Sequence, residues 1–217
     1  MINSFLSSYK AMLTIFSIII LIFSIIIHEV AHGAMAEKLG DKTARDAGRI
    51  SLNPIKHIDL FGSIIVPLFL VLAKSNMLIG WAKPVPINPY ALRDRKYGEA
   101  KVAIAGPLAN ISIALIFALV VRFVPLSNNL FGQNLAMILQ YIVWINLLLA
   151  FFNLTPIPPL DGSHILFAFL PKSADGVKVF LNQFGIFFLI MFIYFVFPYL
   201  GKYIMEVFQL LVGAKVL

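Results

Sequence analysis

The sequence predicts an all-α polytopic membrane protein with about five to six transmembrane helices and one short extended or re-entrant segment. Hydrophobic residues make up 60% of the 217 positions, whereas charged residues make up only 12%. Several uncharged stretches approach the roughly 20 residues that a helix needs to cross the hydrocarbon core of a bilayer. The net charge is +7, but the basic residues fall in short loops between the apolar stretches. This distribution follows the positive-inside rule of membrane proteins and does not indicate a nucleic-acid-binding surface.

The first transmembrane helix is predicted over residues 12–39. Residues 11–27 contain no charge, and His28, Glu29 and His32 follow directly as the motif HEVAH. Residues four apart lie on the same face of a helix, so the two histidines can hold one metal ion. Glu29 is offset from them by about 100° and could take a proton from a water molecule at that metal. Ionisable groups within a transmembrane helix are energetically costly, which favours a functional role for all three.

A charged sequence, AEKLGDKTARD, follows the first helix, so we do not expect this helix to be a cleaved signal peptide. Residues 61–73 are apolar but short, and the prolines of residues 81–88 favour extended or turn structure. Basic loops on both sides of this region should share one side of the membrane, so residues 61–90 should cross it an even number of times. Because non-helical backbone at membrane depth must be covered, we expect residues 81–88 to lie extended beside the metal site.

Two further spans are predicted over residues 102–121 and 136–154. The second ends in a proline-rich break, TPIPPLDG, at residues 155–162. If the basic loop before residue 102 is cytoplasmic, the first of these spans runs outward and the second runs back. The break and His32 should then both lie toward the cytoplasmic side of the bilayer. A short apolar segment and one or two closing helices follow, over residues 163–170, 184–200 and 203–212.

A hydrolytic metal site usually has three protein ligands and an open position for water. The sequence has no cysteine, so histidines and carboxylates must hold the metal. Asp161 ranks first as the third ligand, because it follows an apolar span and a broken backbone that needs a cavity. His57 and Asp59 lie in a polar loop, where a solvated role is the expected alternative. The remaining candidates are His164, Glu37 and Asp41. Of these, Glu37 and Asp41 should lie in water beyond the first span.

Two motifs, HEVAH in the first helix and FNLTPIPPLDG at residues 152–162, together resemble the site-2 protease family of intramembrane zinc metalloproteases. The sequence GPLAN at residues 106–110 also fits that family. The resemblance covers the chain from His28 to Gly162. A short motif such as HExxH recurs by chance, but both motifs in order, each within apolar sequence, make the resemblance specific.

The resemblance implies one zinc ion bound by His28, His32 and Asp161, with Glu29 as the general base. It also implies that Asn153 positions the substrate or stabilises the oxyanion. Asn110 is a second candidate for this role, with an interhelical hydrogen bond as its alternative. Interhelical hydrogen bonds alone are expected of Gln140 and Asn146.

The function that the resemblance implies is that of an intramembrane zinc metalloendopeptidase, which hydrolyses peptide bonds in or near the transmembrane segments of membrane proteins. Its partners would be a transmembrane protein substrate and the lipid bilayer, with no nucleic acid. We expect a single membrane-embedded domain over residues 1–217, in a minimal form without PDZ or CBS domains. We expect a multi-pass protein of a prokaryotic cell membrane, with the active site toward the cytoplasm.

Two other functions stay open at this point. A non-proteolytic metal-binding membrane scaffold would not need a general base such as Glu29. A metal transporter would carry imidazoles and carboxylates at several depths of the bilayer, whereas the candidate ligands here converge on one depth.

Overall fold

The computed structural model describes residues 2–59, 82–125 and 129–213, together with Gly62, Ile65 and Phe69. All regular secondary structure within these residues is helical, which confirms the predicted all-α class. The longer helices are α1 (Ile2–Lys38), α4 (Gly98–Phe123), α5 (Leu130–Asn153), α7 (Asp175–Met191) and α8 (Phe197–Val212). The shorter ones are α2 (Thr43–Asp46) and α6 (Asp161–Phe169), with 3₁₀ turns at Pro54–His57, Pro89–Ala91 and Lys172–Ala174.

Four helical runs within the described residues are long and apolar enough to cross a membrane: Thr14–Lys38, Gly98–Phe123, Leu130–Asn153 and Asp175–Val212. The protein is therefore a polytopic membrane protein, as predicted. The last run contains both predicted closing segments, 184–200 and 203–212. Most of the predicted apolar segment 61–73 lies outside the described residues, as does Trp81 at the start of the predicted extended segment.

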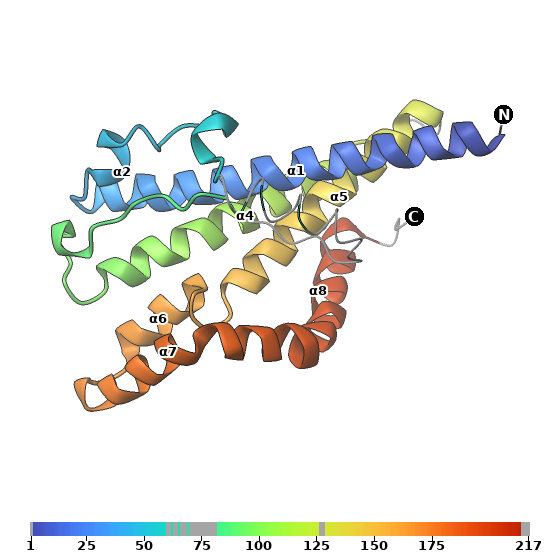
Figure 1. Ribbon diagram of the computed structural model, residues 1–217. Helices are drawn as coiled ribbons and strands as arrows, with labels where there is room; N and C mark the ends of the chain where they lie inside the picture. Colours follow the sequence, from blue (N-terminus) through green and yellow to red (C-terminus); the bar gives the residue numbers. More distant parts are fainter. Residues whose placement is uncertain are drawn as a thin grey trace.

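Helices α7 and α8 meet at a sharp bend (Figure 1). A π-helical turn, Phe192–Val196, lies at the bend, and Pro198 follows in the first turn of α8. Proline has no N–H to donate to the carbonyl four residues earlier, and π turns are a recognised cause of helix kinks. The two closing segments therefore form one bent helical run.

The core of the bundle lies between α4, α5 and α8, while α1 packs against α4 and α5. Small residues on α4, such as Ala114 and Ala118, are almost fully buried. Small side chains let transmembrane helices approach closely, so that dispersion contacts replace contacts with lipid. The buried core residues are Ala114, Ala118 and Val121 of α4, Leu139, Val143 and Leu147 of α5, and Ile204, Phe208 and Val212 of α8.

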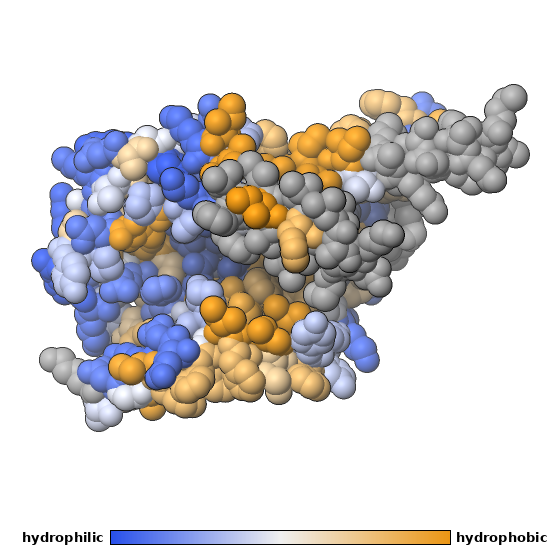
Figure 2. Space-filling view, viewed as in Figure 1, coloured by the Kyte–Doolittle hydropathy of each residue, from blue (hydrophilic) through white to orange (hydrophobic). Residues whose placement is uncertain are grey.

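The polar loops gather at one end of the molecule. Helix α2 lies near the end of α1, and the loop that leads into α4 lies at the same end (Figure 1). Hydrophilic residues cover this end in the space-filling view, and hydrophobic residues gather over the half of α7 that leads to its bend with α8 (Figure 2). The two basic loops that the crossing count puts on one side of the membrane therefore share one end of the bundle.

Asp41 fastens this polar end to residues 82–88. Its Oδ1 accepts hydrogen bonds from the Thr43 N–H (2.9 Å) and hydroxyl (2.5 Å), and its Oδ2 accepts one from the Asn88 N–H (2.6 Å). Asp41 is 0% exposed, so the expectation that it lies in water is wrong. The reason is Gly40, whose φ of 110° turns the chain back onto the end of α1. Glu37 remains partly exposed and pairs with Arg45 at 2.8 Å.

Burial alone would raise the pKa of the Asp41 carboxyl, but the hydrogen bonds from Thr43 and Asn88 outweigh it and lower the pKa below its usual 3.8. A lowered pKa in the folded state means that the ionised carboxylate stabilises the fold above the unfolded-state pKa. That stabilisation is lost as the pH falls through the lower, folded-state pKa.

Asp41→Asn should lower the free energy of unfolding at neutral pH by about 1–3 kcal/mol, because hydrogen bonds to a charged acceptor are stronger than those to a neutral one. The difference from the wild type should shrink as the pH is lowered below about 3.9. Thermal unfolding of both proteins in detergent across this pH range measures the difference. Asp46→Asn, at an exposed side chain of α2, is the control. Equal stability of Asp41→Asn and wild type at neutral pH would contradict this role.

Candidate metal centre

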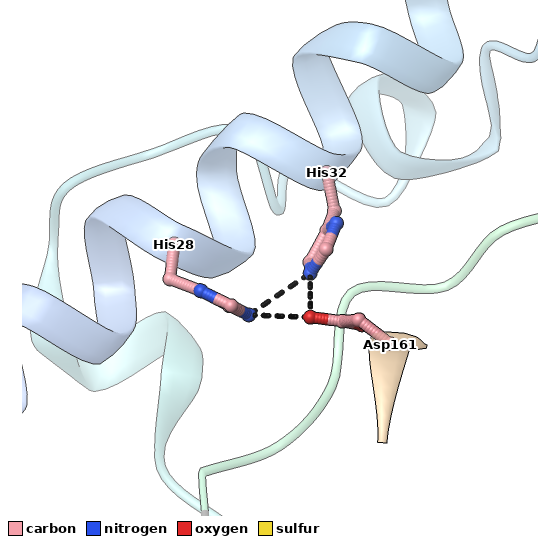
Figure 3. A group of neighbouring side chains, drawn as sticks. All are labelled: His28, His32 and Asp161. Atoms are coloured by element: carbon pink, nitrogen blue, oxygen red, sulfur yellow. Dashed lines mark hydrogen bonds and ion pairs between the residues drawn. The ribbon is translucent and has the colours of Figure 1, made fainter. Parts of the chain in front are cut away.

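His28 and His32 lie one turn apart on α1 and both face Asp161, the first residue of α6 (Figure 3). Asp161 Oδ2 is 3.1 Å from His28 Nε2 and 3.3 Å from His32 Nε2. The two Nε2 atoms are 3.0 Å apart. Both histidines are 6% exposed. Within the described part of the chain, these three residues form the one group of His, Asp and Glu side chains that could hold a metal ion.

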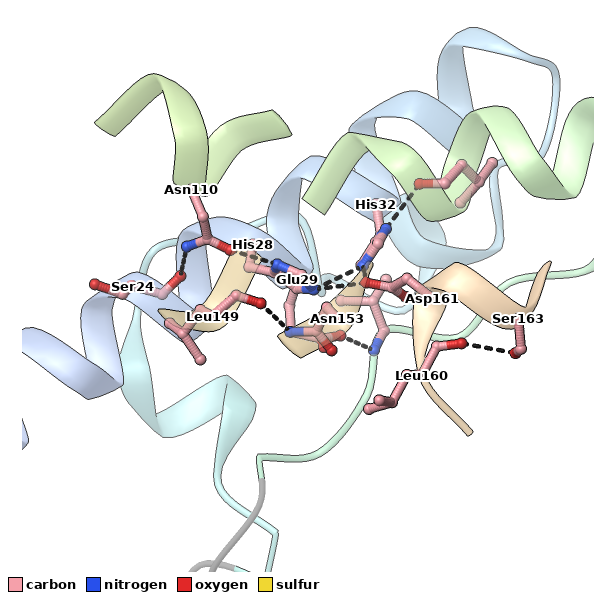
Figure 4. A network of polar contacts seen from close by, with 12 residues as sticks. Ser24, His28, Glu29, His32, Asn110, Leu149, Asn153, Leu160, Asp161 and Ser163 are labelled. Carbon is pink, nitrogen blue, oxygen red and sulfur yellow. Dashed lines mark hydrogen bonds and ion pairs between the residues drawn. The ribbon is translucent and has the colours of Figure 1, made fainter. Parts of the chain in front are cut away.

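The outer nitrogen of each imidazole makes a hydrogen bond that fixes which nitrogen carries the proton. His28 Nδ1 lies 2.6 Å from Asn110 Oδ1, and His32 Nδ1 lies 2.8 Å from the carbonyl oxygen of Val102 (Figure 4). Both partners are oxygens that only accept, so each Nδ1 donates a hydrogen. In the neutral form that binds a metal, each imidazole then turns the lone pair of Nε2 toward Asp161, in the arrangement typical of metal-ligating histidines.

Three lone-pair-bearing atoms thus meet in a buried place. Asp161 Oδ2 is buried and accepts no hydrogen bond, as expected when both neighbouring Nε2 atoms are unprotonated. Without a cation this arrangement would be repulsive and leave a buried carboxylate oxygen unsatisfied. In a tetrahedral zinc site with bonds of 2.0–2.1 Å, ligand atoms lie about 3.3 Å apart. The observed separations of 3.0–3.3 Å fit that geometry. Two imidazoles and one carboxylate are a donor set that zinc accepts, and no thiolate is needed.

Gly106 of α4 lets the backbone of that helix approach the two imidazoles. A Cβ atom at this position would lie 2.5 Å from His32 Nε2 and 2.6 Å from His28 Nε2. Real Cβ atoms do not approach that closely, so any side chain here would displace the histidines. In the sequence Gly106 stands out only as part of GPLAN. Its contact with the histidines depends on how α1 and α4 pack, which the sequence does not predict.

Asp161 reaches the site because the chain turns sharply between α5 and α6. The carbonyls of Leu154 and Thr155, at the end of α5, lie against Gly162 at positions that a Cβ atom would overlap. Gly162 therefore lets the start of α6 pack directly on the broken end of α5. This explains the pairing of a proline-rich break with Asp-Gly: the break ends one helix, and the glycine allows the ligand beside it to point back toward α1.

A buried polar cluster behind His28 joins three helices. Asn110 donates to Asn146 Oδ1 (2.8 Å) and to the Ser24 carbonyl (3.3 Å). Asn146 donates to the Ser24 hydroxyl (2.9 Å). Asn110 and Asn146 are 0% exposed. Asn146 thus forms the interhelical bonds that the sequence predicts, and Asn110 combines such a bond with holding His28. Ser24 was not anticipated, since a serine in an apolar helix carries no distinctive signal.

Glu29 lies beside residues 82–88, and its Oε2 accepts a hydrogen bond of 2.8 Å from the Val85 N–H (Figure 4). Residues 82–88 contain no helix or turn, so the predicted extended segment is confirmed over its described part, and it does lie next to the motif HEVAH. Asn153, at the end of α5, donates from Nδ2 to its own helix at Leu149 O (2.9 Å). That bond satisfies a backbone carbonyl near the C-terminal end of α5. The role of Asn153 toward a substrate stays a prediction.

The other candidates for the third ligand lie elsewhere. Asp59 accepts a hydrogen bond from the Gly62 N–H (2.7 Å), and His164 lies on the surface, 3.5 Å from Glu99. His57 is only 2% exposed and its Nε2 lies 2.7 Å from the Ser51 carbonyl. The expectation of a solvated His57 is therefore wrong: the buried imidazole bonds to a backbone carbonyl of its own loop.

Comparison with known proteins shows similarity to zinc metalloproteases. The family model of peptidase family M50 matches residues 121–192. The Bacillus subtilis protein named "Putative zinc metalloprotease YwhC" is 36% identical over 201 residues, which cover 91% of this chain and 87% of that protein. Zinc metalloprotease MJ0392 of Methanocaldococcus jannaschii is 28% identical over 162 residues, 74% of this chain but only 36% of the relative. No solved structure matches the chain.

The similarity to the Bacillus subtilis relative spans nearly the whole of both chains, and the matched M50 region contains the break at residues 155–162 with Asp161. The HEVAH motif, the metal-binding geometry and the apolar helices agree with it. The chain therefore belongs to peptidase family M50, the site-2 protease family of intramembrane zinc metalloproteases.

Proposed function

We propose that this protein is an endopeptidase that binds one zinc ion through His28, His32 and Asp161 and cuts peptide bonds in or near the transmembrane segments of membrane proteins. The observation that carries the proposal is the buried meeting of two Nε2 lone pairs and one unsatisfied carboxylate oxygen, with Glu29 next to His28 on the same helix. This set contains three ligands and a base, which is what hydrolysis of an amide requires.

Zinc bound there would supply a water of pKa near 7 and a positive charge for the carbonyl oxygen of the scissile bond. Glu29 takes the proton from the attacking water and gives it to the amide nitrogen, so that the C–N bond breaks to a carboxylate and an amine. Asn110 and the Val102 carbonyl hold both imidazoles in the tautomer that leaves Nε2 free. We assign Asn153 to the substrate side of the site, where its amide would position the peptide or stabilise the oxyanion.

The substrate must be unwound locally, because the peptide bonds of a transmembrane helix are already hydrogen-bonded and shielded. The extended residues 82–88 beside Glu29 could receive the unwound stretch as an added strand. Pro84 and Pro86 have no N–H, so this edge would offer mainly carbonyl acceptors. The N–H groups of the substrate would then make most of the hydrogen bonds.

We place the protein in the cell membrane of a prokaryote with its polar, basic end in the cytoplasm. The support is the clustering of both basic loops at one end of the bundle, since cytoplasmic loops carry an excess of Lys and Arg. The relatives named above come from a bacterium and an archaeon. The site then opens toward the cytoplasmic half of the bilayer, because HEVAH lies in the part of α1 that approaches this end.

Glu29→Gln should strongly slow cleavage while the zinc content stays near one ion per chain, because the amide cannot accept the proton but the three ligands remain. The expected loss of rate is about 10²- to 10⁴-fold. The measurements are metal analysis of the protein purified in detergent and cleavage of a panel of single-pass transmembrane model proteins. Glu37→Gln, on the same helix but paired with Arg45, is the matched control and should cleave normally.

A wild type that binds zinc but cleaves none of the panel would contradict the protease and favour a metal-binding scaffold. Uptake of zinc into sealed vesicles containing the protein would favour a transporter instead. Glu29→Gln cleaving at the wild-type rate would contradict the role of the base.

Gly106→Ala should weaken zinc binding by about tenfold or more, because its Cβ atom would push both Nε2 atoms out of place. Competition with a zinc-sensitive chelator dye measures the affinity. Gly201→Ala, within α8, is the matched control, since a Cβ atom added there would meet no other atom within 4 Å. Zinc affinity of Gly106→Ala equal to that of Gly201→Ala would show that the close approach of α4 does not matter for the site.

A further inference from the structure

Arg49 is a buried cation whose hydrogen bonds lead toward the active site. It is 7% exposed, and its Nη2 donates to the carbonyls of Lys83 (2.6 Å) and Pro84 (3.3 Å). Among the described residues, no carboxylate lies within ion-pair distance of this guanidinium. A buried guanidinium without a direct acid partner is unusual, because removing its charge from water is costly.

The carbonyl of Pro84 and the N–H of Val85 belong to one peptide group. Arg49 donates to the oxygen of this group, and the N–H of the same group donates to Glu29 Oε2 at 2.8 Å. Arg49 and Glu29 are therefore connected through a single peptide unit with a hydrogen bond at each end. Hydrogen bonds in such a chain polarise one another, so a cation on the carbonyl strengthens donation from the N–H.

The strap, residues 83–88, is fixed at both ends and in its middle. The Lys83 N–H donates to the His57 carbonyl (2.9 Å), and the Asn88 N–H donates to Asp41 (2.6 Å). The Val85 side chain is 6% exposed and packs beside Gly33 of α1, where an added Cβ would lie 3.1 Å from Val85 Cγ1. The strap thus holds the Val85 N–H at a defined place beside α1.

We propose that the Val85 N–H and Arg49 are positioning groups for Glu29. They hold Oε2 of the carboxylate, so that Oε1 is the oxygen left to take the proton of the attacking water. This inference rests on the proposed function of Glu29 as general base. It adds two groups to the surroundings of Glu29. One is Arg49, which lies outside both metal-binding motifs, and the other is the backbone N–H of Val85 in the middle of the strap.

Val85→Pro removes this N–H from a segment that already has proline on both sides. We expect kcat to fall about 10- to 100-fold, the range that corresponds to a hydrogen bond to a charged acceptor. KM and zinc content should change little, because neither the strap's remaining hydrogen bonds nor the three ligands are removed. Val85→Ala is the matched comparison: it removes the buried side chain but keeps the N–H, so its kcat should fall much less than that of Val85→Pro.

Arg49→Gln should lower kcat about tenfold with KM little changed, since it removes the charge that polarises the peptide. Arg49→Lys should restore much of this loss, because an ammonium can donate to the same carbonyls. Arg95→Gln, at an exposed arginine, controls for the loss of one positive charge. All variants are assayed in detergent with zinc content and thermal stability measured, using the transmembrane model protein that the wild type cleaves.

Equal kcat values for Val85→Pro and Val85→Ala, with wild-type cleavage intact, would overturn the positioning role and leave the protease function standing. Arg49→Lys as impaired as Arg49→Gln would overturn the part assigned to the charge. Loss of zinc or of folding in both Arg49 variants would assign Arg49 to the fold. A wild type without any cleavage would instead remove the proposed function on which the inference rests.

Discussion

The structure depends on the crowding of two imidazole nitrogens and one carboxylate oxygen, all with their lone pairs directed at one another inside the protein. At separations of 3.0–3.3 Å and with little water to screen them, these atoms repel unless a cation lies between them. The surrounding residues make this arrangement possible. Asn110 and the Val102 carbonyl fix the tautomers. Gly106 and Gly162 have no Cβ atom, so α4 can approach the histidines of α1, and α6 can approach the end of α5.

The elements that form the site also hold the bundle together. Ser24, Asn110 and Asn146 join α1, α4 and α5 by hydrogen bonds in the protein interior, where each unsatisfied polar group would be costly. Because Asn110 also holds His28, a change in the packing of these helices would be transmitted to the metal ligand. The strap is connected in a similar way: Asp41 and Arg49 fix its backbone, and its backbone holds Glu29. Fold and site therefore share their polar contacts.

The sequence predicts those features that depend on local pattern. The helix of HEVAH, the broken backbone before Asp161 and the extended strap follow from spacing, hydropathy and proline content, and the structure agrees with each over its described residues. Contacts made by packing could not be predicted. Asp41 is buried because Gly40 turns the chain back, and His57 is buried with its Nε2 against the Ser51 carbonyl. Gly106 is next to the histidines because of how two helices cross. The Val85 N–H could not be foreseen either, since a backbone donor has no signature in the sequence.

X-ray absorption at the zinc edge of the purified protein tests the central claim most directly, because it reports the ligands of the metal itself. We expect one zinc ion per chain with two imidazole nitrogens and one carboxylate oxygen at about 2.0–2.1 Å, and a further light atom from water. Asp161→Ala should lose the carboxylate and keep both imidazoles. A spectrum with three imidazoles, with a single imidazole, or without stoichiometric zinc would contradict the assignment of His28, His32 and Asp161 as the metal site.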